Sequence, residues 1–289
     1  MTKKLAISIV IPTLGDRKLL KLIKHLNKDN NYKISEIILS IPRNKFNYIK
    51  DLTRNWDNIK IIYSNKNGQV LQRIKGFKLA KEEYVLQLDD DILIDANSIN
   101  ILMRNMYGIN CQKAISPVYK DFNKKYLNEK RKNFLSQIRL FIMCLLFGSI
   151  KKINSIGNIS NALINYGFGK QINGIKNIEV EWLLGACVIH KKKNLILENF
   201  YPYEGKSYCE DLLHSIELRK KNIKLFITNS AYVYCKTENN INNFRELLKY
   251  IKALNLFVKR SNQGLFDNIK KIQFFFIYQT LKLLLKKIT

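Results

Sequence analysis

Two acidic clusters hold the residue types best suited to chemistry, and the first is Asp89-Asp90-Asp91. Carboxylates about 4 Å apart repel each other by ~4 kcal/mol at an effective dielectric of about 20. A divalent cation removes this repulsion, and Mg²⁺ or Mn²⁺ is usually held by one or two carboxylates together with substrate phosphates. Alternate side chains of an extended segment share a face, so Asp89 and Asp91 are the predicted metal ligands. Capping of the following helix by Asp91 or Asp95 is the alternative.

The second cluster is Glu210-Asp211, which opens a helix predicted over residues 210–221. A hydroxyl nucleophile must lose its proton as it attacks, and a carboxylate such as Asp211 can accept that proton as a general base. The alternative is that both carboxylates only stabilise the positive end of the helix dipole. His214 follows on roughly the same helix face, where we interpret it as a partly buried residue rather than a metal ligand.

Strand and helix patterns alternate over the N-terminal third of the chain. This alternation predicts an α/β fold with a mostly parallel central sheet flanked by helices. Ligands of such sheets bind at the carboxyl ends of the strands, and Asp89 directly follows an apolar run. The predicted strands cover residues 5–11, 36–41, 59–63 and 84–88, and the predicted helices cover residues 16–28 and 69–81.

The rest of the chain returns to β character and then becomes strongly basic. Residues 178–190 and 223–235 are predicted to complete one domain that spans residues 1–238. Within it, residues 119–176 form a basic insertion whose apolar stretch, 134–150, contains an arginine and is shorter than the ~20 residues of a membrane-spanning helix. We therefore interpret that stretch as an interfacial or packed helix.

The formal net charge of +27 predicts attraction to polyanions, namely phosphorylated ligands, anionic lipids or nucleic acid. Residues 239–289 are predicted to form cationic amphipathic helices that suit an anionic bilayer surface. Helices packed on the domain with a solvated basic face, and a compositional bias toward lysine, are equally good explanations. A nucleic-acid-binding protein is disfavoured, because the sequence has no helix-turn-helix, KH, RRM or zinc signature and its charge is spread along the chain.

The five cysteines include no CxxC pair, so neither a disulfide framework nor a zinc site is indicated, and a reducing cytoplasm fits. Hydrophobic residues make up 46% of the chain, which supports a folded core. The apolar run near the N-terminus is too short for a secretory signal and is predicted to be the first buried strand.

Four segments in order resemble a family 2 glycosyltransferase with the GT-A fold, over about residues 5–235. They are SIVIPT (8–13), GQVLQRIKGFKLAKEEYVLQLDDD (68–91), EWLLGA (181–186) and CEDLLHSIELRKKNIKLF (209–226). The resemblance implies an inverting, Mg²⁺- or Mn²⁺-dependent enzyme that uses a nucleotide-diphosphate sugar. It also implies a glycan or lipid-linked acceptor, a role in cell-surface polysaccharide synthesis, and a peripheral location at the cytoplasmic face of the cell membrane. A non-catalytic relative that scaffolds a polysaccharide-assembly complex is the alternative.

The resemblance also assigns roles to individual residues. Asp89 and Asp91 match the DxD motif, with Asp91 the more direct metal ligand, and Asp211 matches the catalytic base beside Glu210. On the donor side it implies contacts from Pro12, Thr13, Arg73, Gly76, Asp89 and Asp90. On the acceptor side it implies Trp182, which could equally belong to the core, and Gly185, which would let a ligand approach the backbone.

Two departures from the family pattern concern the donor and the metal. Residues 40–44 replace an acidic turn that holds the nucleoside in many relatives, so nucleoside recognition must differ here. Cys235 stands where relatives often carry a histidine near the metal, and Mg²⁺ does not favour a thiol ligand. We therefore expect a metal site completed by water and diphosphate.

Overall fold

A computed structural model of the chain describes residues 6–15, 17–27, 33–64, 68–108, 111–122, 157–159, 165–166, 177–236 and 244–261. The predicted apolar stretch 134–150 and the C-terminal residues 262–289 lie outside the described residues. Among the residues that are described, no helix combines the length and the apolar character needed to span a bilayer.

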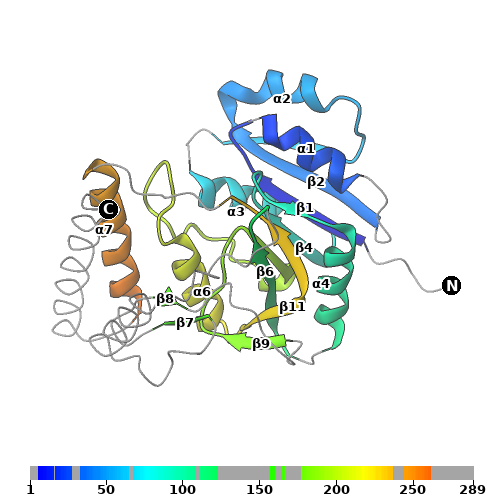
Figure 1. The fold of residues 1–289 in the computed structure, drawn as a ribbon. Helices are drawn as coiled ribbons and strands as arrows, with labels where there is room; N and C mark the ends of the chain where they lie inside the picture. The colour runs from blue at the N-terminus through cyan, green and yellow to red at the C-terminus, as the bar shows by residue number, and fades with distance from the viewer. Residues whose placement is uncertain are drawn as a thin grey trace.

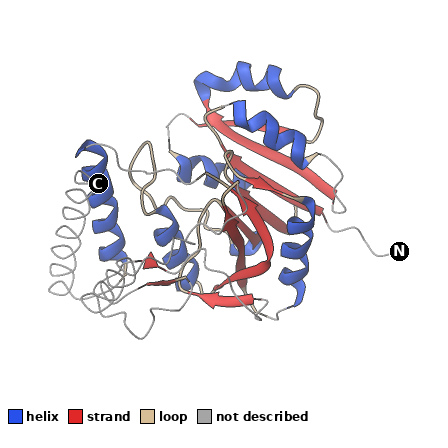
Figure 2. Ribbon diagram, in the orientation of Figure 1, coloured by secondary structure: helices blue, strands red, loops and turns tan. Residues whose placement is uncertain are grey.

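The centre of the molecule is one twisted sheet, with strand order β3-β2-β1-β4-β10-β6-β11-β5 and with β9 paired to β11 (Figures 1 and 2). Its pairings β3-β2, β2-β1, β1-β4 and β6-β11 are parallel. The pairings of β10 with β4 and β6, and of β11 with β5 and β9, are antiparallel. The predicted α/β fold is confirmed, with a sheet that is mixed. The strands are β1 (Ala6–Pro12), β2 (Lys33–Pro42), β3 (Ile59–Ser64), β4 (Tyr84–Leu88), β5 (Leu93–Ile94), β6 (Lys113–Lys120), β9 (Asn177–Val180), β10 (Cys187–Lys191) and β11 (Lys224–Tyr234). A separate antiparallel pair joins β7 (Asn158–Ile159) to β8 (Asn165–Tyr166).

Helices pack around the sheet (Figure 1). They are α1 (Arg17–Leu26), α2 (Phe46–Thr53), α3 (Gln69–Leu79), α4 (Ala96–Gly108), α6 (Glu210–Lys220) and α7 (Phe244–Arg260), with short 3₁₀ turns at Arg43–Lys45 and Lys192–Asn194. Helix α3 packs on β1 and β2, and α4 packs on β6 and β11. Helix α6 contacts both β11 and α7, so α7 is joined to the sheet through α6.

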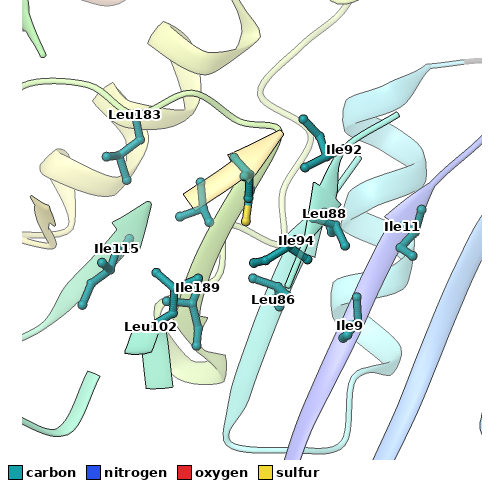
Figure 3. Packing of buried hydrophobic residues seen from close by; sticks show 14 of the residues in the cluster. Ile9, Ile11, Leu86, Leu88, Ile92, Ile94, Leu102, Ile115, Leu183 and Ile189 are labelled. Atoms are coloured by element: carbon teal, nitrogen blue, oxygen red, sulfur yellow. The ribbon is translucent and has the colours of Figure 1, made fainter. Parts of the chain in front are cut away.

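Strand β1 shows why the sequence forms a sheet that is buried on both faces. Ile7, Ile9 and Ile11 point into the main core, which continues through β4 and β10 (Figure 3). Val10 points to the opposite face, where Phe77 of α3 packs against it in a second cluster. Alternating β-branched residues on both faces are typical of central parallel strands.

The carboxyl ends of β1, β4 and β11 lie at one edge of the sheet, and β10 brings a further segment there. Strand β10 is antiparallel to both of its neighbours, a reversal that the strand prediction did not specify. Its register places Cys187 opposite Leu88, so the loop before β10 meets the residues that follow β4. The amide of Asp89 donates to the carbonyl of Ala186 over 2.8 Å and fixes this meeting.

Candidate functional site

A cavity of about 460 Å³ opens at this edge of the sheet. Both predicted acidic clusters contribute to its wall, although they lie in distant parts of the sequence. The lining residues come from the start of α3, the segment after β4, the loop before β10, the loop before α6, the start of α6, and α7. They are Gln69, Asp89, Asp91, Leu184, Ala186, Lys206, Ser207, Tyr208, Cys209, Glu210, Asp211, Leu212 and Tyr250.

The three consecutive aspartates have three different environments. Asp89 accepts a hydrogen bond from Arg73 Nη2 on one carboxylate oxygen (2.9 Å) and from Gln69 Nε2 on the other (2.9 Å). The carboxylate of Asp90 accepts a hydrogen bond from the hydroxyl of Thr13. Asp91 is exposed and lines the cavity. Of the two predicted metal ligands, Asp91 is therefore the more accessible, while both oxygens of Asp89 already accept hydrogen bonds from the protein.

Arg73 forms the buried link between the two acidic clusters. Its Nη2 pairs with Asp89 and its Nη1 pairs with Glu210 over 2.7 Å, and its side chain is only 3% exposed. Burial lowers the pKa of this guanidinium, but the charges of Glu210 and Asp89 outweigh burial and raise it. The sequence prediction placed Arg73 against a donor diphosphate. The structure places it instead beneath the cavity, where it pairs with protein carboxylates.

The Glu210-Asp211 pair sits in the first turn of α6, where the helix dipole favours negative charge. Cys209, immediately before the pair, has φ 56° in the left-handed region. A left-handed residue other than glycine is uncommon and is often found at functional sites. Burial and then the charge of Glu210 raise the pKa of the Asp211 carboxyl well above its usual range. A carboxylate with a raised pKa is a stronger base toward a hydroxyl proton.

Gly185 belongs to the site for a different reason from the one predicted. A Cβ atom at this position would lie 2.7 Å from Oε1 of Glu210 and 3.3 Å from Oδ1 of Asp211. Because glycine has no Cβ atom, the two carboxylates can occupy this space. The prediction expected a ligand to approach the backbone there.

Gly76 and Trp182 do not line the cavity. A Cβ atom on Gly76 would collide with the side chain of Val10, so this glycine allows α3 to pack closely on β1. Trp182 is 4% exposed and is part of the main core. The core alternative considered for Trp182 is therefore the one that the structure supports.

Pro12 and Thr13 end β1 in a network of hydrogen bonds. The amide of Thr13 donates to the carbonyl of Ser40 at the end of β2 (3.0 Å). Gln72 Nε2 donates to the carbonyls of Thr13 (3.2 Å) and Ser40 (2.8 Å). Because Thr13 also donates to Asp90, this network ties the ends of β1 and β2 to the aspartates that follow β4.

The remaining predicted residues lie close to the site but outside the cavity lining. Cys235 follows β11, and burial first, then the charge of Asp91, raise its thiol pKa to about 11. The thiol therefore stays protonated at neutral pH. His214 is buried between Phe200, whose ring stacks on it at 5.4 Å, and His190 at 5.5 Å. Burial lowers the pKa of His214 well below its usual range, and that of His190 to about 3.

Several cavity residues were not predicted from the sequence. Gln69, which holds Asp89, lies within one of the segments that carry the family resemblance and could have been found there. Lys206 and Tyr208 come from the loop before α6, and Tyr250 comes from α7, where no spacing or motif indicates a site. Their contribution follows from the packing of α7 on α6.

The residues of the cavity fit a hard divalent cation that also binds a diphosphate. In the described part of the chain, no group of three or more His, Cys, Asp or Glu side chains is arranged to hold a metal ion. One accessible carboxylate, Asp91, still fits Mg²⁺ or Mn²⁺, which usually take their other ligands from water and substrate phosphates.

Comparisons with known proteins agree with this geometry. The profile of glycosyl transferase family 2 matches residues 8–165, which is more than half of the chain. No curated protein matches the sequence.

Solved structures with the same fold share little sequence with the chain. A GalNAc-T7 structure with UDP, GalNAc and Mn²⁺ has a TM-score of 0.57 at 12% identity, and the match covers 81% of this chain and 44% of that one. Staphylococcus aureus TarS 1-349 with UDP-GlcNAc has a TM-score of 0.54 at 15% identity, with 92% and 69% covered. A second structure of Staphylococcus aureus TarS 1-349 has a TM-score of 0.51 at 14% identity, with 92% and 68% covered. The chain thus spans less than half of GalNAc-T7 and about two thirds of the TarS fragment. These likenesses show the fold, the predicted GT-A arrangement.

Proposed function

The chain belongs to glycosyl transferase family 2, and on that premise we propose that it moves a sugar from a nucleotide-diphosphate donor to an acceptor hydroxyl with inversion. The observation that carries the proposal is the convergence of Asp91 and Asp211 on one cavity. One carboxylate is accessible to a cation and the other has the raised pKa of a base. A transferase needs both functions within reach of one reacting carbon.

Asp211 is the general base in this proposal. The acceptor oxygen forms a bond to the anomeric carbon while the bond from that carbon to the donor diphosphate breaks. Asp211 takes the acceptor's proton as the new bond forms. Glu210 does not compete for this role, because its carboxylate is held by Arg73 over 2.7 Å. Attack from the face opposite the leaving group inverts the anomeric configuration.

Asp91 would hold Mg²⁺ or Mn²⁺, and a bound cation would neutralise the charge that develops on the leaving diphosphate. Both nucleotide-bearing neighbours support a UDP-sugar as donor, and the GalNAc-T7 structure also contains Mn²⁺. Lys206, which also lines the cavity, adds a positive charge where a diphosphate would be attracted.

Thr13 and Asp90 contact the donor in this proposal. Pro12 ends β1 directly before Thr13, and Asp90 follows β4 and accepts the hydrogen bond of the Thr13 hydroxyl. Residues 40–44, which replace the acidic turn, run into the short helices that follow β2. Nucleoside recognition would then rely on the ends of β1 and β2, where Gln72 already binds both backbones.

We also propose, as the family resemblance implies, that the chain acts on a glycan or lipid-linked acceptor in cell-surface polysaccharide synthesis at the cytoplasmic face of the membrane. The outer face of α7 supports the membrane location. Its exposed residues are Phe244, Arg245, Leu248, Lys249, Lys252 and Lys259. This combination of cations and apolar side chains suits an anionic bilayer surface.

The experiment that tests the transferase proposal separates donor binding from chemistry. Calorimetry with UDP and Mn²⁺ should give binding to the native chain and to Asp211→Asn, but binding that no longer depends on Mn²⁺ in Asp91→Ala. Release of UDP from UDP-sugars, measured for the native chain without acceptor and with candidate acceptors, should fall at least 100-fold in Asp211→Asn.

Asp51→Ala, an exposed position on α2, is the matched control and should behave like the native chain in both assays. Undiminished UDP release by Asp211→Asn would refute the base assignment. Absence of any UDP-sugar turnover by the native chain, together with absence of UDP binding, would favour the scaffolding alternative.

A further inference from the structure

Two tyrosines line the cavity, and neither was assigned a role by sequence or family. Tyr208 comes from the loop before α6, and Tyr250 comes from α7. Their rings meet edge to face, with centroids 5.9 Å apart and planes at 88°. Both tyrosines lie beyond residues 8–165, where the family profile matches.

Tyr250 is held in place on the cavity side of α7. Its side chain hydrogen-bonds the thiol of Cys209, and the ring of Tyr208 supports it from the side. Tyr208 is buried, whereas Tyr250 is partly exposed and lines the cavity. A bound molecule can therefore reach the ring of Tyr250, while Tyr208 acts as its support.

The position of Tyr250 is fixed relative to the proposed base. Cys209, its hydrogen-bond partner, is two residues before Asp211, and the charge of Asp211 acts on the Cys209 thiol. An acceptor whose hydroxyl reaches Asp211 must place its remaining atoms in the cavity beside the start of α6. Tyr250 and the apolar side chains of Leu184 and Ala186 form the surface available there.

We propose that Tyr250 is a specificity-determining residue that stacks against the apolar face of a sugar ring in the acceptor. A pyranose combines an apolar face of C–H groups with hydroxyls at its rim, so it matches an aromatic surface bordered by carboxylates and Lys206. The acceptor is then a carbohydrate at the point of attack, whatever carries it. This inference rests on the proposed transferase function, because it takes Asp211 as the base.

Saturation-transfer NMR can test the inference with methyl pyranosides of glucose, galactose, mannose and N-acetylglucosamine, each in the presence of UDP and Mn²⁺. The native chain should bind at least one of them. Tyr250→Phe, which keeps the ring and loses the bond to Cys209, should stay within threefold of the native affinity. Tyr250→Ala, and Tyr250→Leu as a variant that keeps apolar volume, should bind at least tenfold more weakly.

Tyr203→Ala is the matched control, because Tyr203 also joins the same loop to α7, through a 3.3 Å hydrogen bond from its hydroxyl to the carbonyl of Lys252, but does not line the cavity. It should bind the pyranosides like the native chain. Native affinity in Tyr250→Leu, or binding of UDP but of no pyranoside by the native chain, would overturn the inference. Pyranoside binding that depends on Tyr250 without any binding of UDP would uphold it and count against the proposed donor instead.

Discussion

Arg73 of α3 and Glu210 of α6 lie 137 positions apart in the chain and are joined by a 2.7 Å ion pair beneath the cavity. The same guanidinium holds Asp89 over 2.9 Å. The buried guanidinium of Arg73 thus fixes the distance between the segment proposed to bind the metal ion and the segment proposed to carry the base. Its role is to position the two acidic clusters.

Replacing Arg73 by Met should destabilise the fold by roughly 3–5 kcal/mol, because two largely buried carboxylates lose their counter-charge. Urea unfolding followed by far-UV circular dichroism measures this loss. Adding Asp89→Asn and Glu210→Gln to Arg73→Met removes the uncompensated charge and should recover most of the stability. If the single variant loses less than about 1 kcal/mol, the pair is not the buried link described above.

Gly185→Ala should impair catalysis while leaving donor binding intact. The new Cβ would approach Glu210 and Asp211 to 2.7 and 3.3 Å, so the carboxylates must move. Forcing an extra methyl group into a packed site costs ~1–3 kcal/mol. We expect at least a tenfold loss of sugar transfer, measured as UDP release, with unchanged calorimetric affinity for UDP and Mn²⁺.

Gly68→Ala is the control for this change, since its Cβ would meet nothing closer than 3.9 Å. It should transfer sugar like the native chain. Equal activity of Gly185→Ala and Gly68→Ala would show that the start of α6 tolerates displacement. The close packing of Gly185 against Glu210 and Asp211 would then not be needed for catalysis.

The sequence predicted the elements of the site well where local pattern decides structure. The short apolar run before Asp89 is typical of a buried strand, and the carboxylates of Glu210 and Asp211 suit a helix N-terminus. The structure has a strand, β4, and a helix, α6, at these two places. Their convergence in one cavity could be expected from the family resemblance, but the alternation of strands and helices alone did not bring them together.

What the sequence could not predict depends on partners distant in the chain. A glycine shows that space is needed but not what fills it, and at Gly185 the space belongs to protein carboxylates. The charge of Arg73 suits a diphosphate as well as Asp89 and Glu210, and only its burial decides between them. Tyr250 lies in an amphipathic helix whose packing on α6 follows from no local pattern.

The buried His190–His214 pair predicts that acid weakens the fold. Burial, followed by the charges of His190 and Arg73, lowers the folded pKa of His214 well below the unfolded value of about 6.5. Below that pH the unfolded chain binds a proton that the folded chain does not, so stability falls as pH decreases, by ~1.4 kcal/mol per pH unit for this group. His214→Phe removes the effect and preserves the stacking on Phe200.

The measurement is the difference in unfolding free energy between His214→Phe and the native chain from pH 7 to pH 4.5. A difference is needed because burial raises the pKa of Asp89 to about 6, which makes the folded chain bind the extra proton and opposes the histidines. As pH falls, the unfolding free energy of His214→Phe should rise steadily relative to that of the native chain. His25→Gln, at an exposed position of α1, should show no such gain, and a flat difference for His214→Phe would contradict a neutral buried imidazole.

The outer face of α7 should bind anionic membranes through its lysines. Each Lys near an anionic surface contributes ~1 kcal/mol, so Lys249→Gln with Lys252→Gln should lower partitioning onto vesicles containing phosphatidylglycerol roughly 30-fold. Sedimentation with sucrose-loaded vesicles measures this, and vesicles of phosphatidylcholine alone should bind little. Lys18→Gln with Lys21→Gln places the same change, at the same spacing, on the exposed side of α1 and should leave binding unchanged. An equal loss in both double variants would mean that net charge, and not α7, attracts the chain to the membrane.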